Sequence, residues 1–248
     1  MCMFIKKILH RFGAWISYVL VVMAIFVCFL FFQFPINFAR VKGRKNIPRK
    51  GNNILFVANH DTMFDSFFIG ICAFFFRVIF YPSEPFVNFA DQKNYFTTWY
   101  VKCLLKMLRT EPVARRDQAM LMKRYVQLLK KRNLLIFYQG TRSKDLTLIK
   151  DGPAFAIRNA KPTPIVVPVF HEGMDRIFSR GGPKTHGIWR WLPRSLFRRP
   201  TIVFGKPIDF TDLLTIDDSR KATDAINTRI VREIQLLKEF LSTTNAVS

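Results

Sequence analysis

Residues 14–34 form an apolar run, AWISYVLVVMAIFVCFLFFQF, in which no side chain is charged. As an α-helix this run is roughly 31 Å long at ~1.5 Å per residue, close to the ~30 Å hydrocarbon core of a bilayer. A secretory signal peptide is the competing interpretation, because Lys6, Lys7 and Arg11 would form its basic region. The run is longer than a usual signal-peptide core, and we find no convincing small-x-small cleavage site. The pattern therefore favours a membrane-anchoring segment over residues 1–39.

Beyond residue 51, short apolar runs alternate with stretches that have one apolar and one charged face. The apolar runs predict four buried strands at 54–58, 134–138, 165–169 and 201–204. Helical periodicity with a charged outer face predicts helices over 117–131 and 221–241. Strands separated by helices indicate an α/β fold, with a mixed, largely parallel sheet flanked by helices. We expect one folded domain, residues 40–248, behind an N-terminal membrane helix or helical hairpin.

The charge balance narrows the partners of this domain. The chain carries 39 Lys and Arg against 17 Asp and Glu, a formal net charge of +22, while half its residues are hydrophobic and 27 are Phe. So many apolar residues exclude a disordered chain. A strongly basic protein suits either nucleic acid or an anionic membrane surface. The apolar N-terminal run favours the membrane, and no nucleic-acid partner is expected.

Basic residues flank the apolar run on both sides and predict its orientation. They are Lys6, Lys7 and Arg11 before it, and Arg40, Lys42, Arg44, Lys45, Arg49 and Lys50 after it. The heavier flank is C-terminal, so the positive-inside rule places the bulk of the protein on the cytoplasmic side. Two basic flanks also fit a hairpin that enters and leaves one leaflet, and the sequence leaves both arrangements open.

Residues 180–199, RGGPKTHGIWRWLPRSLFRR, interleave basic and aromatic side chains. This composition fits a solvated surface loop as well as a patch that contacts lipid headgroups, where Trp is enriched and Lys or Arg is attracted to anionic lipid. The sequence does not separate the two interpretations.

The usual catalytic signatures are absent from the sequence. It contains no G-x-S-x-G elbow, no phosphate-binding G-x-x-x-x-G-K-[ST] loop, no H-E-x-x-H and no G-x-G-x-x-G. The four cysteines form no C-x-x-C pair, and no histidine lies at metal-ligand spacing, so we expect no metal site.

His60 directly follows the strand predicted at 54–58, and Asp65 comes five residues later. The ends of strands on open sheets are where sites form. If His60 lies in the strand-to-helix turn, with Asp61 or Thr62 as the helix N-cap, Asp65 can point back at the ring from the first turn of the helix. A carboxylate on one imidazole nitrogen leaves the other free to take a proton from a hydroxyl. The alternative is a capping Asp beside an unrelated histidine.

Five blocks in register make the sequence similar to the glycerolipid acyltransferases, in particular the lysophosphatidic acid (1-acylglycerol-3-phosphate) acyltransferases. The blocks are N-H-x-x-x-x-D at 59–65, TEPVARR at 110–116, FYQGTRS at 137–143, KDG at 150–152 and PIVVPV at 164–169, with GKPI at 205–208 as a late turn. The resemblance spans residues 40–210 and carries the family's HX4D motif. It implies that 40–248 is an acyltransferase catalytic domain.

The resemblance implies a role for each block. The enzyme would move a fatty acyl group from acyl-CoA or acyl carrier protein to the hydroxyl of a lysophospholipid, most of all 1-acylglycerol-3-phosphate, giving phosphatidic acid. His60 would be the general base, oriented by Asp65, with no covalent acyl-enzyme and no cofactor. The acceptor phosphate calls for cations, and the candidates are Arg115, Arg116, Arg142 and Lys150. Gln139, Gly140 and Thr141 would position the acceptor or a developing oxyanion.

Two positions depart from the family pattern and leave alternatives open. Gln139 replaces a family Glu, and Tyr138 replaces a Pro. Loss of the carboxylate leaves the acceptor headgroup open, and a catalytically silent lipid-binding protein is a second hypothesis. The Phe-rich segment 67–80 is either a groove for the fatty chain or a buried core helix. Acyl donor, chain length and oligomeric state are not encoded in a recognisable pattern.

Overall fold

A computed structural model describes residues 2–49, 51–78, 80–81, 85–96, 99–107, 109–113, 117–179 and 192–246. Most of the basic and aromatic segment 180–199, including Trp189 and Trp191, therefore lies outside the described residues. The same holds for Arg115 and Arg116 of the second block.

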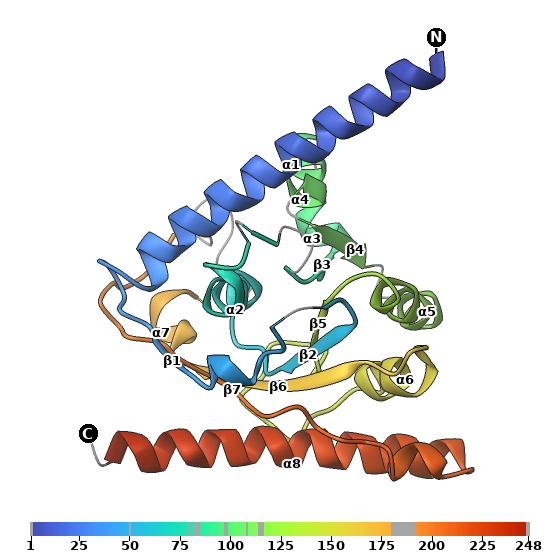
Figure 1. The fold of residues 1–248 in the computed structure, drawn as a ribbon. Helices are drawn as coiled ribbons and strands as arrows, with labels where there is room; N and C mark the ends of the chain where they lie inside the picture. Colours follow the sequence, from blue (N-terminus) through green and yellow to red (C-terminus); the bar gives the residue numbers. More distant parts are fainter. Residues whose placement is uncertain are drawn as a thin grey trace.

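Strands and helices alternate along the described chain (Figure 1). The strands are β1 (Arg40–Lys42), β2 (Ile54–Ala58), β3 (Asn88–Asp91), β4 (Thr110–Val113), β5 (Leu134–Phe137), β6 (Ile165–Glu172) and β7 (Thr201–Phe204). The α-helices are α1 (Cys2–Phe32), α2 (Asp65–Phe74), α3 (Gln92–Tyr95), α4 (Trp99–Met107), α5 (Gln118–Leu129), α6 (Gly152–Asn159), α7 (Met174–Ile177) and α8 (Ser219–Ala246). Short 3-10 helices cover η1 (Arg44–Asn46) and η3 (Leu213–Thr215).

The main sheet has five strands in the order β1-β7-β6-β2-β5. The pairs β1–β7, β6–β2 and β2–β5 are parallel, and only β6–β7 is antiparallel. The predicted mixed, largely parallel α/β sheet is confirmed, and the strands at 54–58 and 201–204 have the predicted bounds. Strand β6 runs three residues past the predicted 169, and helix α8 extends beyond both predicted ends. The strand β3 pairs with β4 in a separate two-stranded sheet.

Helices cover both faces of the main sheet, with α2 and α1 on one side and α8 on the other (Figure 1). Because side chains alternate along a strand, β2, β5, β6 and β7 each contribute to the hydrophobic cores on both faces of the sheet. On the α2 side the strands contribute Phe56, Ala58, Val167, Val169, Ile202 and Phe204. On the side of α5, α6 and α8 they contribute Leu55, Val57, Leu134, Ile136, Val166 and Val203. Burial on both faces explains why these strands are continuously apolar in sequence.

The segment 67–80 is divided by this packing. Its first part lies in α2, where Phe68, Ile71 and Phe74 are buried in the core, as the core-helix interpretation predicts. Past the end of α2 its aromatics turn outward, and Phe76 and Phe80 are 62% and 76% exposed. The segment 67–80 is thus a core helix in its first part and an exposed aromatic surface in its last part.

Helix α1 contains the apolar run and is partly attached to the domain. Residues Phe12–Phe32 have a mean hydropathy of 2.7 and are long and apolar enough to cross a membrane by length and composition, and 11% of that segment is buried. At its C-terminal end Phe29 stacks on Phe75 with ring centroids 3.8 Å apart, and Phe32 packs on Phe68 at 5.3 Å. The other end of α1 projects away from the sheet (Figure 1).

Candidate active site

The site forms at the carboxyl end of β2, between its two parallel neighbours. The register pairs Ala58 with Phe137 of β5 and with Val169 of β6. Two residues further on, His60 is therefore level with Gln139 on one side and His171 on the other. Because side chains alternate along a strand, all three positions lie on the face of the sheet that α2 covers. The carboxyl edge of a parallel sheet is the usual place for a ligand site in open α/β folds.

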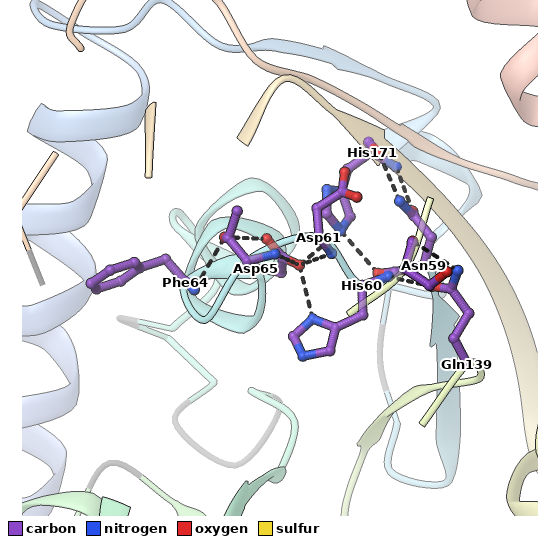
Figure 2. Close-up of polar contacts among 9 residues, drawn as sticks. Asn59, His60, Asp61, Phe64, Asp65, Gln139 and His171 are labelled. Atoms are coloured by element: carbon purple, nitrogen blue, oxygen red, sulfur yellow. Dashed lines mark hydrogen bonds and ion pairs between the residues drawn. The ribbon is translucent and has the colours of Figure 1, made fainter. Parts of the chain in front are cut away.

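The structure places the His60 ring against Asp65, as the spacing predicted. Nδ1 of His60 is 2.9 Å from Oδ2 of Asp65 (Figure 2). A carboxylate oxygen only accepts, so Nδ1 carries the proton in the neutral ring and Nε2 keeps a lone pair. The ring also stacks on Phe137 at a centroid distance of 4.0 Å, and 20% of the His60 side chain is exposed. The lone pair of Nε2 thus belongs to a ring that is held on one side and open on the other.

Asp65 is wholly buried and hydrogen-bonded on both oxygens. Its Oδ2 accepts from the backbone N–H groups of Asp61 at 2.6 Å and Thr62 at 2.8 Å, and its Oδ1 accepts from the Thr62 hydroxyl at 2.6 Å. Burial alone raises the pKa of Asp65, but attraction to the His171 ring and the hydrogen bonds from His60 and Thr62 bring the pKa below its ordinary value of 3.8. Asp65 is therefore ionised at neutral pH and holds the turn and the imidazole together.

The turn differs in one detail from the prediction. Asp61 or Thr62 was expected to be the N-cap of α2, whereas the helix begins at Asp65 and its N-cap residue is Phe64, which forms no side-chain cap bond. The reason is that the Asp61 and Thr62 N–H groups already point at the Asp65 carboxylate, so the chain closes a tight turn first. The Thr62 hydroxyl still accepts a hydrogen bond from Phe64 N at 3.3 Å.

His171, near the end of β6, is a member of the site that the sequence pattern did not single out. The residue is wholly buried, and its Nε2 lies 3.0 Å from the backbone oxygen of Asn59 and 3.6 Å from Oδ2 of Asp65. Nδ2 of Asn59 donates to the His171 carbonyl, and the His171 N–H donates to Oδ1 of Asn59, both at 2.9 Å. The carboxylate of Asp65 thus lies between two imidazoles (Figure 2). Position 171 becomes visible from sequence only once the register of β6 against β2 is known.

Gln139 lies behind His60 and is bonded to backbone on all sides. Its Oε1 accepts from His60 N at 2.7 Å, and its Nε2 donates to the carbonyls of Ser143 at 2.9 Å and Asp145 at 2.6 Å. The Ser143 N–H donates back to the His60 carbonyl at 2.9 Å. The buried amide therefore ties the His60 turn to the loop after β5. A carboxylate in this position could not donate to either carbonyl.

The turn after β5 places the remaining candidates. Gly140 has φ +66°, a left-handed conformation that favours glycine, and its N–H donates to the Phe137 carbonyl at 3.0 Å. A Cβ on Gly140 would stand 2.9 Å from Cγ of Lys150, so the Lys150 stem packs on this turn. Thr141 is exposed at the tip, and Arg142 beside it is half-buried. The structure thus bonds Gln139 and Ser143 to the His60 backbone and packs Lys150 on Gly140, while Arg115 and Arg116 lie outside the described residues.

Clustered metal ligands are not found in the described part of the chain, where no group of three or more His, Cys, Asp or Glu residues could hold an ion. The acid–base chemistry available to the site comes from the His60–Asp65 pair. A base with one buried carboxylate partner and one open nitrogen is suited to take a proton from a bound hydroxyl.

Comparison with known proteins gives a family and a fold. The sequence profile of the Acyltransferase family matches residues 38–172, more than half of the chain. Among solved structures, the chain is similar to the 1-acyl-sn-glycerophosphate (LPA) acyltransferase PlsC from Thermotoga maritima, with a TM-score of 0.52 and 20% sequence identity over 81% of this chain and 73% of that chain. At this identity the likeness concerns the fold. No curated protein matches the sequence.

Proposed function

Because the chain belongs to the acyltransferase family, we propose that it transfers a fatty acyl group from an acyl thioester to the free hydroxyl of a lysophospholipid, with His60 as general base. The observation that carries this proposal is the 2.9 Å contact between Nδ1 of His60 and Asp65, which leaves Nε2 as the open basic nitrogen. The preferred acceptor is 1-acylglycerol-3-phosphate, and the product is then phosphatidic acid. The similar fold of an LPA acyltransferase supports this choice of acceptor.

The proposed reaction is a direct transfer. Nε2 of His60 takes the proton of the acceptor hydroxyl as its oxygen attacks the thioester carbonyl, so that a C–O bond forms while the C–S bond breaks. The thiol of coenzyme A or of acyl carrier protein leaves and recovers the proton from the imidazolium. Asp65 stabilises the charged ring in between, because its own carboxylate is kept ionised. The acceptor phosphate binds the cations of the 139–150 loop, Arg142 and Lys150, together with Arg115 or Arg116.

The headgroup of the acceptor is the part of the substrate that remains open, and Gln139 bears on it. A silent lipid-binding protein was motivated by the missing family carboxylate at this position. The hydrogen bonds of Gln139 give the replacement a structural reason, because its amide satisfies two carbonyls and the His60 N–H. This geometry favours an active enzyme over a silent one.

The experiment that tests the proposal follows acyl transfer in purified membranes. Labelled acyl-CoA and acyl carrier protein are offered with 1-acylglycerol-3-phosphate, lysophosphatidylglycerol and lysophosphatidylcholine. Wild type should acylate the first acceptor fastest, and His60→Ala should fall to background. His186→Ala, which removes a histidine outside the HX4D motif, is the matched control and should retain activity. Equal rates for wild type and His60→Ala would exclude His60 from the chemistry.

We further propose that α1 attaches the enzyme to one leaflet of the membrane rather than crossing it. From residue 12 onward, where the side chains of α1 are described, the exposed large apolar residues are Phe12, Trp15, Met23, Phe26, Val27 and Leu30. At about 100° per residue these six lie on one face of the helix, within about 60° of a common line. The opposite face packs on the domain through Phe29 and Phe32. Because the domain contacts one face of the second half of α1, lipid cannot surround the helix there.

Other exposed aromatics extend this membrane-facing side. Phe76, 62% exposed, stands edge-on to Phe29 of α1 at 6.4 Å, and Trp99, 80% exposed, begins α4, which contacts α1. The basic residues that follow α1 would face anionic headgroups on the cytoplasmic side. Because Phe32 is part of the core, removal of α1 as a signal peptide would also open the domain.

A further inference from the structure

A small cavity between α1 and α2 is lined by a half-buried arginine, Arg109, that has no counter-ion among the described residues. Its apolar walls come from Val21, Ala24, Ile25 and Cys28 of α1 and from Phe67, Gly70 and Ile71 of α2. Its polar end is formed by Asn88 and Arg109. None of His60, Gln139, Gly140 or Arg142 lines it. The cavity is therefore separate in its lining from the proposed catalytic residues.

Arg109 is held there against an electrostatic cost. Its Nη1 is buried and has no hydrogen-bond partner, and no carboxylate forms an ion pair with it among the described residues. Burial and repulsion from Arg132 lower the pKa of Arg109 to about 10, so the side chain still carries its charge at neutral pH. The backbone of Arg109 has φ 58°, a left-handed conformation that residues with a side chain rarely adopt. Buried unpaired charges and strained backbone both persist where a ligand or a function compensates for them.

Asn88 adds a second unsatisfied group beside this cation. Its Oδ1 is buried without a partner, and its backbone N–H lies 3.4 Å from the Arg109 carbonyl. The guanidinium needs an anion, whereas the amide oxygen needs a hydrogen-bond donor. One ligand head that carries both a phosphate and a hydroxyl satisfies the two groups together.

The size and walls of the cavity define the rest of the ligand. The volume of the cavity is about 70 Å³. Since about 10–15 Å³ is enough for one water molecule, the cavity has room for a single small head but not for two acyl chains. The adjoining walls are aliphatic and aromatic, and the outer face of α1 is the one that we place in the membrane. A single chain can therefore leave the head along α1 and α2 toward lipid.

We propose that the cavity is a lipid-binding site, distinct from the catalytic residues, for a single-chain anionic phospholipid whose phosphate binds Arg109 and whose hydroxyl binds Asn88. The site requires no catalysis and does not depend on His60. Its occupation fixes α1 against α2, because both helices contribute to the walls. Lipid composition would thus control how firmly the membrane helix is attached to the catalytic domain.

Cys28 provides a local readout of this site. It lines the cavity and is half-buried, whereas Cys72 is fully buried and Cys103 is exposed. In full-length protein carrying Cys2→Ser, Cys103→Ser and His60→Ala, Cys28 is the accessible thiol, and turnover of the lipid is abolished. Its alkylation rate by a maleimide is measured in neutral detergent micelles. Saturating 1-acylglycerol-3-phosphate should slow the reaction at least fivefold, and lysophosphatidylcholine, which lacks a net negative charge, should not.

Arg109→Met tests the role of the cation, and Arg124→Gln is the matched control, because Arg124 is exposed and paired with Glu111 at 2.9 Å. Arg109→Met should abolish the protection of Cys28, whereas Arg124→Gln should keep it. Thermal unfolding provides a second measurement that does not depend on labelling. Without lipid Arg109→Met should unfold at or above the temperature of the parent, because an uncompensated buried charge is removed. When lipid is added, the unfolding temperature of the parent should rise and that of Arg109→Met should not.

Three results would overturn the proposal. Protection that persists in Arg109→Met would place the lipid elsewhere. Lower stability of Arg109→Met without lipid would give Arg109 a structural partner instead of a ligand. Protection by inorganic phosphate equal to that by the lipid would show that a free anion, not a lipid, occupies the cavity. Loss of acyl transfer in His60→Ala tests the catalytic proposal separately, so the failure of one leaves the other standing.

Discussion

Nε2 of His171 lies 3.6 Å from Oδ2 of Asp65, the same oxygen that accepts from Nδ1 of His60 at 2.9 Å. The His171 ring donates from Nε2 to the Asn59 carbonyl at 3.0 Å, and its Nδ1 is buried without a partner. The second imidazole thus fixes the end of β2 from which His60 projects. We expect it to act on His60, the proposed base, through Asp65 and the backbone rather than by contact with substrate.

Replacement of His171 should slow catalysis without removing the base. His171→Leu leaves the Asn59 carbonyl without its donor, and the loss of one buried hydrogen bond predicts roughly tenfold lower kcat. His171→Gln can place an amide donor where Nε2 stands, so it should restore most of the rate. The measurement is kcat and KM over pH 6–9 in both variants. A rate and pH profile of His171→Leu equal to wild type would contradict a positioning role.

Asp65 links the site to the stability of the fold at low pH. Its pKa is below 3.8 in the folded protein, so the unfolded chain binds more protons as the pH falls. The stabilisation by this carboxylate is therefore complete above its unfolded pKa and is lost as the pH falls through the folded value. In Asp65→Asn that acid-dependent loss should be absent. Unfolding temperatures of both proteins between pH 7 and pH 3 should converge toward the acid end.

The same substitution should abolish most of the activity at neutral pH. An amide at position 65 no longer fixes the proton on Nδ1 of His60, and the corresponding change in serine protease triads costs about 10⁴-fold in kcat. Asp61→Asn is the control, because the contact of Asp61 with Asp65 runs through its backbone N–H. Activity of Asp65→Asn close to that of wild type would show that the imidazole does not need this carboxylate.

The sequence predicted the fold class and the His60–Asp65 pair because both depend on short-range patterns. Apolar runs and helical periodicity determine which segments become strands and helices, and five residues bring His60 and Asp65 into one turn. The contribution of His171 depends on the register of β6 against β2, across 111 residues of sequence. A one-residue shift of that register would turn His171 to the other face of the sheet. Local patterns do not contain this information.

The Gln139 position illustrates the same limit. The resemblance to the family indicated that a Glu is replaced, and that the expected acceptor pocket thereby loses a charge. The partners of the side chain became clear only from the loop that folds back over it, where the Ser143 and Asp145 carbonyls accept from its amide. What looked like a change in the pocket is also a change in the hydrogen bonds of the protein itself.

Gln139→Glu should therefore destabilise the protein before it alters the choice of acceptor. The carboxylate would face two carbonyl oxygens, and an unsatisfied buried acceptor costs about 1–3 kcal/mol, more when it is charged. The deficit should be smaller at pH 5 than at pH 8, because a protonated acid can donate one hydrogen bond. Gln127→Glu, which adds the same charge at an exposed position of α5, is the control. Unchanged unfolding temperature in Gln139→Glu would contradict this prediction.

The attachment of α1 makes a prediction about which side of the membrane its N-terminus faces. If α1 lies in one leaflet, an epitope tag before residue 2 and a tag after residue 248 are both accessible from the same side of sealed vesicles, whereas a crossing helix separates them. The two faces of α1 should also respond differently to substitution. Phe26→Ser, on the exposed face, should weaken membrane binding and leave the unfolding temperature unchanged. Phe32→Ala, in the core, should cost about 3–5 kcal/mol of stability. Tags on opposite sides would show that the domain can follow a helix through the bilayer, which the packing of Phe29 and Phe32 argues against.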